Sequence, residues 1–550
     1  MNANDVPDRA GNHRPLTQQA AYLSNGRLIL LGLMGLALLA LLAQMGIAFT
    51  SENVASASIV FASTTAMLLY LLWTPALQTH PLSTFAVFGF CVTSQFGALL
   101  GQTLYWTPLA DNLRQPIATF ALLAAFQALA MVAHTGHRWL MPAPEAQRGS
   151  LPRQLLHKAG LYNTPSTGVL WFMGYVGLLA FLLGSGREGT FGKAMHGLAF
   201  ITWAPFLIPM YLIQFGDAYS SFRRQWPYLA VFAGLVVLLG LAANARQVML
   251  SGFVTIALFA LLGAMRSTNK VSGKRVLKLG VLGLVLAGLA IPLSDLATAM
   301  VVARKVRSNV SAVQMVQETL YYFQRPEALA EQNEDQRNAT LGKYDEYYFE
   351  NPLLARLVET KFHDNSLYFV STFTQSDADL LTETTVDLFW AILPDPVIKR
   401  LGVNIDKKSL EFSMGDYLSH LSQGAPLGSR RTGSMLAQGV ALLGVGFAVL
   451  YIAFCLVAFT MMDLLSFRNR SGQVVLSAVG MLAVWRLFQY GVTSESLQAW
   501  VSGMLRTIPQ NIVLFLLVAA VARSLGMFFG GGSRGERGPL HRATGLHTSS

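Results

Sequence analysis

Side chains suited to phosphate chemistry gather in the second half of the chain, around an acidic and polar stretch. Arginine guanidinium groups give forked, charge-assisted hydrogen bonds to phosphate oxygens, and two of them can share a pyrophosphate. The candidate arginines are Arg246, Arg304, Arg307, Arg430 and Arg431. Arg304 and Arg307 are three residues apart and so share a helix face. Lipid anchoring explains the same arginines equally well, and that alternative stays open.

A candidate acid–base group lies in the segment LLARLVETKFHDNSL, residues 353–367. His363 titrates near neutrality, which suits removal of a proton from a hydroxyl, and Asp364 follows it directly. Arg356 is seven residues before His363, which places both on one face of a helix. An ordinary surface pair of His and Asp is the alternative.

Familiar metal and nucleotide motifs are absent from the sequence. No phosphate-binding glycine loop, HExxH, paired CxxC or GxSxG occurs, and Asp377-Ala-Asp379 is a short pattern that arises often by chance. The two cysteines, Cys91 and Cys455, both lie inside apolar runs. The sequence therefore predicts neither a metal site nor a cofactor.

The composition requires a membrane to position these groups. Of the 550 residues, 53% are hydrophobic and 13% charged, against about 25% charged in ordinary soluble domains. The net charge of +11 comes largely from short basic segments beside apolar runs, where Lys and Arg set orientation and meet anionic lipid head groups. We therefore expect lipid, and not nucleic acid, as the partner of the basic residues.

Apolar runs of span length predict an all-α polytopic protein with about twelve transmembrane helices, at about twenty residues per span. We expect a cytoplasmic tail at 1–27, helices one to nine within 28–293, a large periplasmic loop at 294–433, helices ten to twelve within 434–529, and a disordered cytoplasmic tail at 530–550. The expected spans are 28–49, 54–76, 82–106, 115–134, 166–184, 196–216, 227–243, 248–265, 276–293, 434–460, 473–491 and 509–529. The pair 227–243 and 248–265 is short enough that a broken or re-entrant element is an alternative.

The distribution of Lys and Arg sets the orientation. With the N-terminus inside, the predicted cytoplasmic segments hold twenty Lys and Arg residues and the short outer loops hold five. Cytoplasmic loops carry such an excess, so we expect both termini in the cytoplasm. Arg486 falls inside an expected span, where an unpaired charge is costly, so it should face a polar interior.

The stretch 294–433 differs from the rest, because it holds nineteen of the 29 acidic residues. Val310, Val313, Val316, Leu320 and Phe323 recur at helical spacing, and a second helix is expected from Pro352 to about residue 372. We expect amphipathic helices that lie over the bundle, since no pattern for an independent core is present.

The organisation resembles the Wzy-type polymerases of O-antigen and exopolysaccharide repeat units. The resemblance rests on many spans with one long outer loop before the last few, and it covers mainly residues 244–440. The stretches that carry it are NARQVMLSGFVTIALFALL (244–262), the His-Asp-Asn-Ser of 363–366, and LPDPVIKRLG (393–402) followed by Gly415-Asp416.

This resemblance implies an inverting, metal-independent glycosyl transfer at the periplasmic face of a bacterial inner membrane. A growing glycan on undecaprenyl pyrophosphate would pass to a newly flipped lipid-linked repeat unit, with a flippase and a chain-length regulator as possible partners. The five arginines above would hold pyrophosphate, and Arg356 and Asp395 would bind sugar. His363, Asp364 or Asp416 would serve the acceptor hydroxyl.

Two other functions remain open from the sequence. An O-antigen ligase shares this topology and chemistry, and a polysaccharide flippase or secondary transporter also suits twelve spans. Transporters often show two similar halves with functional groups near the midplane. Here nine expected spans precede the loop and three follow it, and the charges gather at one surface, which favours an enzyme.

Overall fold

The structure is a computed structural model of the 550-residue chain. It describes residues 24–141, 150–184, 190–215, 224–268, 295–300, 302–303, 312–325, 327, 348–349, 351, 354–469 and 472–529. Residues 1–23 of the predicted tail 1–27, the predicted tail 530–550, the whole of the predicted ninth span 276–293, Arg304 and Arg307 lie outside these residues.

Long apolar helices dominate the described residues, as the composition predicts. Nine are long and apolar enough to cross a membrane. A tenth apolar helix, α11 (Trp226–Ala242), has 17 residues. The nine are α1 (Asn25–Ile47), α2 (Ser51–Trp73), α4 to α5 (Pro81–Leu104), α6 (Pro116–Leu140), α8 (Thr167–Gly184), the end of α9 to α10 (Ala194–Phe215), α12 (Arg246–Met265), α21 to α22 (Met435–Asp463) and α25 to α26 (Leu497–Leu525).

Several of these spans are composite. The third combines α4 (Pro81–Cys91), a π-helix η2 (Val92–Phe96) and α5 (Gly97–Leu104). Of the residues in its most apolar part, 83% are buried, so it is the central helix of the bundle. The remaining composite spans contain α9 (Thr190–Leu198), η3 (Ala199–Phe206), α10 (Leu207–Phe215), α21 (Met435–Leu443), η6 (Gly444–Gly446), α22 (Phe447–Asp463), α25 (Leu497–Ser502), η7 (Gly503–Thr507) and α26 (Ile508–Phe529).

One predicted span differs from the structure. Residues 473–491 do not form a single helix: they begin as strand β2 (Val474–Leu476) and continue as two short helices, α23 (Ala478–Leu482) and α24 (Val484–Tyr490). β2 pairs antiparallel with β1 (Ser466–Arg468), with Phe467 opposite Val475. The hydrophobicity of VVL is that of a buried strand, and hydropathy alone does not separate the two. The predicted pair 227–243 and 248–265 does form two helices, α11 and α12.

The described part of the predicted loop forms short helices. They are α14 (Ala312–Phe323), α16 (Leu354–Leu357), α17 (Thr360–Ser371), α18 (Gln375–Ala391), α19 (Asp395–Arg400) and α20 (Met414–Gln423); two further short helices, α3 (Ala76–Thr79) and α7 (Leu151–Ala159), lie outside the loop. The predicted helix over 310–323 is confirmed as α14. The predicted helix over 352–372 is divided into α16 and α17.

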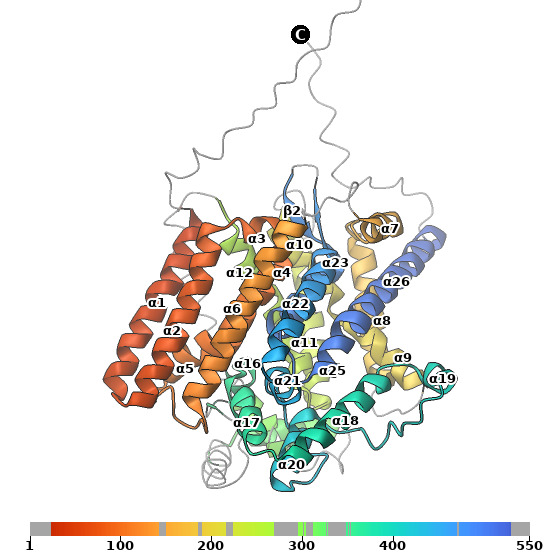
Figure 1. Ribbon diagram of the computed structural model, residues 1–550. Coiled ribbons are helices and arrows are strands. Elements are labelled where there is room, and N and C mark those ends of the chain that lie inside the picture. The colour runs from red at the N-terminus through yellow and green to blue at the C-terminus, as the bar shows by residue number, and fades with distance from the viewer. Residues whose placement is uncertain are drawn as a thin grey trace, which may run out of the picture.

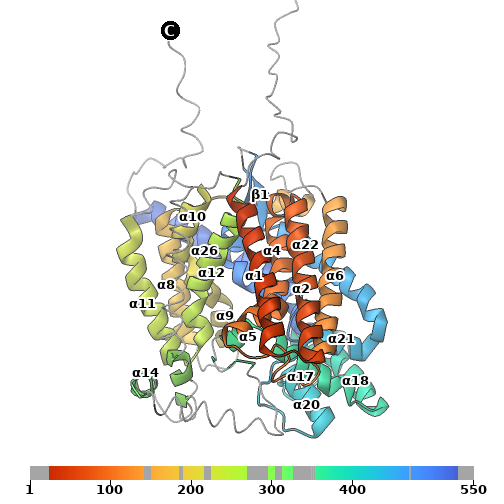
Figure 2. The ribbon, with the colours of Figure 1, turned by 90° about the vertical axis from the view of Figure 1, so that its left-hand side faces the viewer.

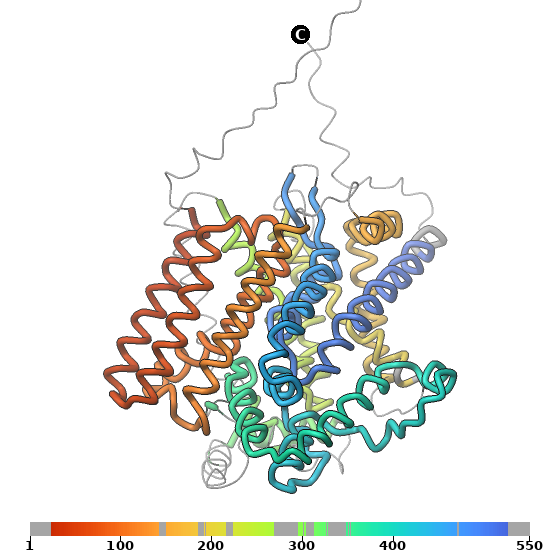
Figure 3. The backbone as a smooth tube through the Cα atoms, viewed as in Figure 1, coloured from red at the N-terminus to blue at the C-terminus, as the bar shows by residue number. Residues whose placement is uncertain are grey.

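The loop helices cover one end of the bundle (Figure 1). We call the end with α17, α18 and α20 the loop face, and the opposite end, with the β1–β2 hairpin, the hairpin face. The first residues of α1 and the last of α26 lie toward the hairpin face (Figures 1 and 2). Phe369, Leu381 and Leu418 form a small core between α17, α18 and α20 that also packs on Leu442 of α21, so the loop helices rest on the bundle (Figure 3).

Candidate functional site

A π-helical turn in the central span holds the start of α17. The backbone N–H of Glu359 donates to the carbonyl of Thr93 at 2.8 Å, and the Thr360 hydroxyl donates to the carbonyl of Ser94 at 2.8 Å. A π-turn interrupts the regular helical hydrogen bonds and so frees carbonyl oxygens for other donors. This contact explains why the predicted helix 352–372 breaks before residue 360: the backbone of Glu359 bonds to the bundle.

His363 lies in the middle of this anchored segment and is only 3% exposed. Its Nδ1 is 2.7 Å from the hydroxyl oxygen of Ser434, which also caps α21 by accepting from the N–H of Ala437 at 3.2 Å. Its Nε2 is buried and has no hydrogen-bond partner. Burial lowers the pKa of His363 to about 4, so the imidazole is neutral at pH 7. In the tautomer with the proton on Nδ1, Nε2 offers a free lone pair.

His363 borders a small cavity of about 10 Å³, enough for about one water molecule. The walls come from α17, from the segment before α21 and from the turn between α24 and α25. The lining residues are Glu359, Phe362, His363, Thr432, Gly433, Tyr490, Ser494 and Glu495. We call this the His363 pocket.

Two carboxyl groups line the His363 pocket. Glu359 accepts from Gln489 Nε2 at 2.8 Å and is also hydrogen-bonded to Tyr490. Burial raises the pKa of Glu359 to about 8 against the opposing effect of these hydrogen bonds, so this carboxyl is protonated at pH 7. Burial also raises the pKa of Glu495, with the positive charges of Arg486 and Arg356 acting in the opposite direction. The pocket thus combines a neutral base with at least one neutral acid.

Arg356 brings a positive charge to the edge of the His363 pocket. Its Nη1 donates to the Thr432 hydroxyl at 3.2 Å, and its guanidinium lies 5.5 Å from the centre of the Phe362 ring. The side chain is exposed. Arg356 thus reaches the pocket through Thr432, but it lies on α16 and His363 on α17, so the predicted shared face of one helix is wrong.

Asp364, predicted as catalytic, has its carboxylate occupied by the backbone at the start of α6. It accepts from the N–H groups of Arg114 and Gln115, both at 2.8 Å, and from the Thr119 hydroxyl at 3.1 Å. The residue is completely buried. These contacts are those of an anchor that ties α17 to the start of α6, because a carboxylate that accepts from several donors is held in position.

Asp416, also predicted as catalytic, makes the same kind of contact with backbone N–H groups, here in the segment before α21. Its carboxylate accepts from the N–H groups of Arg430 at 2.7 Å and Arg431 at 3.0 Å, and it too is completely buried. Gly415 packs so closely that an added Cβ would lie 2.5 Å from the carbonyl oxygen of Arg431. The Gly415-Asp416 pair thus fixes the segment that leads to Thr432, Gly433 and the cavity.

Of the remaining predicted arginines, Arg246, Arg430 and Arg431 are among the described residues, and none of the three lines the His363 pocket. Arg430 has a φ of 57° and an exposed side chain, and the Arg431 guanidinium donates to the Ser419 hydroxyl. Arg246 begins α12, and no residue of α12 lines the His363 pocket.

Asp395 lies at the first turn of α19, at the far end of the loop layer from α17 (Figure 1). It pairs with Lys407 at 2.7 Å, and its side chain is 67% exposed. Asp395 therefore lies away from the His363 pocket, and its position does not support the predicted sugar-binding role.

The sequence analysis did not identify Glu359, Ser434, Tyr490 or Glu495. Glu359 is four residues before His363, and this i,i+4 spacing is a signal that could have found it. Ser434 and Glu495 come from segments 71 and 132 residues away in the chain, and no local pattern relates them to His363.

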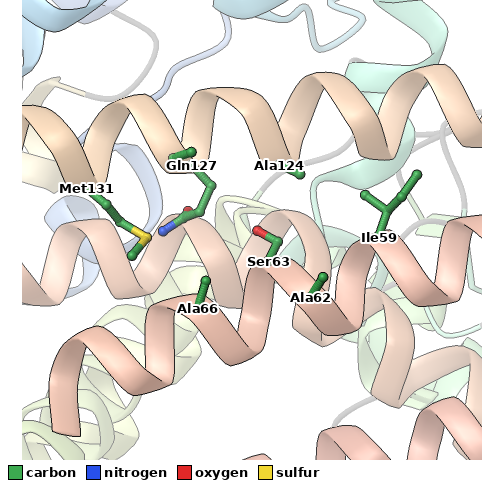
Figure 4. Close-up of a pocket in the computed structure, with 8 residues that line it drawn as sticks. Ile59, Ala62, Ser63, Ala66, Ala124, Gln127 and Met131 are labelled. Carbon is green, nitrogen blue, oxygen red and sulfur yellow. The ribbon is translucent and has the colours of Figure 1, made fainter. Parts of the chain in front are cut away.

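A second cavity, of about 250 Å³, lies between α2 and α6 within the spans. Ile59, Ala62 and Ala66 of α2 face Ala124 and Met131 of α6 across it (Figure 4). Its lining is almost wholly apolar and holds no titratable residue, so it offers no chemistry of the kind found at His363.

Among the described residues, one group of histidine and carboxylate side chains is close enough to hold a metal ion. It consists of His80, His137 and Asp463. These residues come from the hairpin face, at the opposite end of the bundle from His363, and no metal candidate among the described residues includes the His363 pocket.

Comparison with known proteins adds no relative: no family model, curated protein or solved structure matches this chain.

Proposed function

We propose that the chain is a membrane glycosyltransferase that polymerises undecaprenyl-pyrophosphate-linked oligosaccharide repeat units at the loop face. The observation that carries the proposal is the buried, neutral His363, which has an unpartnered Nε2 and borders a cavity lined by two carboxyl groups, with Arg356 at its edge. A site of this kind suits proton removal from a hydroxyl beside an anionic group.

The loop face is the non-cytoplasmic side in this proposal. Arg153 and Arg266 support that orientation, because both bond to backbone carbonyls of the hairpin region, at Ser466 and Val474. Basic residues concentrate on the cytoplasmic side of membrane proteins. The loop face then meets the periplasm of a bacterial inner membrane, where flipped lipid-linked glycans are presented.

The proposed step is an inverting substitution at the anomeric carbon of the donor sugar. The acceptor hydroxyl oxygen forms a bond to that carbon while its proton passes to His363 Nε2. The bond from the carbon to the pyrophosphate oxygen breaks, and undecaprenyl pyrophosphate leaves with the electron pair. The proton on His363 is then lost to solvent, so charge and atoms balance without a metal ion.

Cations near the leaving group lower the barrier, because negative charge develops on the pyrophosphate oxygen. Arg356 lies at the edge of the His363 pocket, and Arg430 and Arg431 lie on the segment that leads to Thr432. Protonated Glu359 can donate a hydrogen bond to a sugar hydroxyl. The cavity now has room for about one water, so a sugar requires the walls of the His363 pocket to move apart.

The test is to delete the gene in its native host and examine the lipid-linked and surface glycans. For a polymerase, single repeat units should remain on the lipid carrier or on the final acceptor, and the long polymer should disappear. Long polymer that stays on the lipid carrier would instead indicate a ligase. Polymer or repeat units trapped on the cytoplasmic side would indicate a transporter and contradict the proposal.

A further inference from the structure

Three buried residues from separate elements meet at the hairpin face. His80 lies between α3 and α4, His137 is in the last turn of α6, and Asp463 is the last residue of α22. One ligand atom from each lies within 4.8 Å of those of the other two. Their exposed fractions are 3%, 2% and 6%, so the group is closed off from bulk solvent.

His80 has a ring nitrogen that the fold leaves without a partner. Its Nδ1 is 3.0 Å from the Thr79 hydroxyl oxygen, its ring also interacts with the backbone of Met141, and its Nε2 is buried with no partner at hydrogen-bonding distance. The His80 and His137 rings lie 5.7 Å apart, centre to centre. A buried polar atom without a partner costs free energy, so a ligand that uses this lone pair would remove that cost.

The other two residues are held in position by further hydrogen bonds. His137 Nε2 is 2.9 Å from Asp463 Oδ2. The Ser83 hydroxyl lies 3.0 Å and 3.1 Å from the two carboxylate oxygens of Asp463, and Arg153 Nη2 donates to the Asp463 carbonyl at 2.6 Å. Such outer contacts orient metal-binding side chains in many proteins.

We propose that His80, His137 and Asp463 form a binding site for a divalent transition metal, with Zn²⁺ the best match. Two imidazoles and one carboxylate are a common zinc ligand set, with the fourth position open to water or another group. Ca²⁺ and Mg²⁺ prefer sites made of oxygen ligands, and Arg138 lies close enough to His80 to repel a cation that is held by charge alone.

The geometry requires only a small adjustment to accept the ion. Ligand atoms around a tetrahedral Zn²⁺ are roughly 3.4 Å apart for bonds of about 2.0–2.2 Å. Rotations of the three side chains would bring the present separations between the ligand atoms, of up to 4.8 Å, down to that value. A metal would replace the proton shared by His137 and Asp463, and that proton would pass to solvent.

Metal binding would join the α3–α4 junction to the ends of α6 and α22. It is therefore expected to stabilise the hairpin face, and it does not depend on the function proposed for the loop face. Since a ligand that binds only the folded protein raises its stability, metal content and thermal unfolding provide two readouts that need no activity assay.

The experiment uses the full chain in detergent, purified without a polyhistidine tag and stripped with EDTA. The stripped protein is equilibrated with ZnCl₂ or CoCl₂ and desalted, and the metal content is measured by mass spectrometry. We expect about one ion per chain, a higher unfolding temperature, and visible absorption typical of four-coordinate Co²⁺. His80→Gln should weaken binding by about tenfold or more, on the scale seen when metal-site groups are lost.

His157→Gln is the matched control, because His157 is exposed on α7 near the same face. It should bind metal as the wild type does. Wild-type protein that retains no Zn²⁺ or Co²⁺ after refilling would overturn the proposal. Equal retention by wild type and a folded His80→Gln variant would also overturn it. If His80→Gln does not fold, Asp463→Asn is measured in its place, with the Co²⁺ spectrum of the wild type as the independent criterion.

Discussion

The two ends of the bundle both bury histidine beside carboxyl groups, but the groups are connected differently. At the hairpin face, His137 is paired directly with Asp463 at 2.9 Å, and Ser83 holds the carboxylate. At the loop face, His363 bonds to the hydroxyl of Ser434, while Glu359 bonds to Gln489 and Tyr490. A base paired with a carboxylate suits a bound cation, whereas a base kept apart from its carboxyl neighbours is free to accept a proton.

The carboxylates around His363 also divide into two kinds. Asp364 and Asp416 are saturated by backbone N–H groups and hold the walls in place. Glu359 and Glu495 face the cavity, and burial raises the pKa of each. Closeness to a histidine in the sequence therefore does not identify its acid–base partner. The adjacent Asp364 is an anchor, and the more distant glutamates line the cavity.

The largest effect is expected from His363→Ala. If Nε2 accepts the acceptor proton, the variant should lose about 10²–10⁴-fold in polymer formation, the usual contribution of a positioned general base. His420→Ala is the control, since His420 is exposed on α20 in the same layer. Polymer length on gels and protein level in membranes are the measurements. Normal polymer from a stably inserted His363→Ala protein would refute the assignment of the site.

A smaller effect is expected from Asp416→Asn. The amide can accept one of the two N–H groups of Arg430 and Arg431 but not both, so we expect a loss of about 1–3 kcal/mol in the free energy of unfolding. Asp395→Asn is the matched control, because its exposed pair with Lys407 is worth at most about 1 kcal/mol. Unfolding in detergent with a chemical denaturant measures both variants. Equal stability of the two would contradict the anchoring role and restore Asp416 as a catalytic candidate.

How far the sequence predicts this arrangement depends on the range of the interactions. Most of the described spans and α14 follow from local hydrophobicity, and His363 is a candidate by residue type alone. The break before α17 does not, because it depends on carbonyls of a π-turn some 260 residues earlier in the chain. The strand at 474–476 falls in a predicted helical span, because a continuous apolar run has no periodicity that separates a strand from a helix. The roles of Asp364 and Asp416 depend on backbone donors from α6 and from residues 430–431, which only the folded chain brings near.

The smallest expected effect concerns the pH dependence of stability. The unfolded chain releases the Glu359 proton near the ordinary value of 4.5, while the folded chain keeps it until about pH 8. The folded state therefore binds more protons between these values, and its stability falls as the pH rises toward 8. His363, with its pKa lowered to about 4, gives the opposite trend, but only below its ordinary value of 6.5. Between pH 6.5 and 8, Glu359 thus contributes a fall in stability that His363 does not oppose.

Glu359→Gln keeps the shape of the side chain and removes its proton equilibrium. The unfolding temperature of this variant should fall less between pH 6.5 and 8.5 than that of the wild type. The fall that remains is due to Glu495 and other groups. Glu383→Gln, at an exposed position of α18, should leave the wild-type slope unchanged. If Glu359→Gln shows the same fall as the wild type, Glu359 is not protonated in the folded protein. The two ends of the bundle would then no longer differ in having a neutral acid beside the histidine.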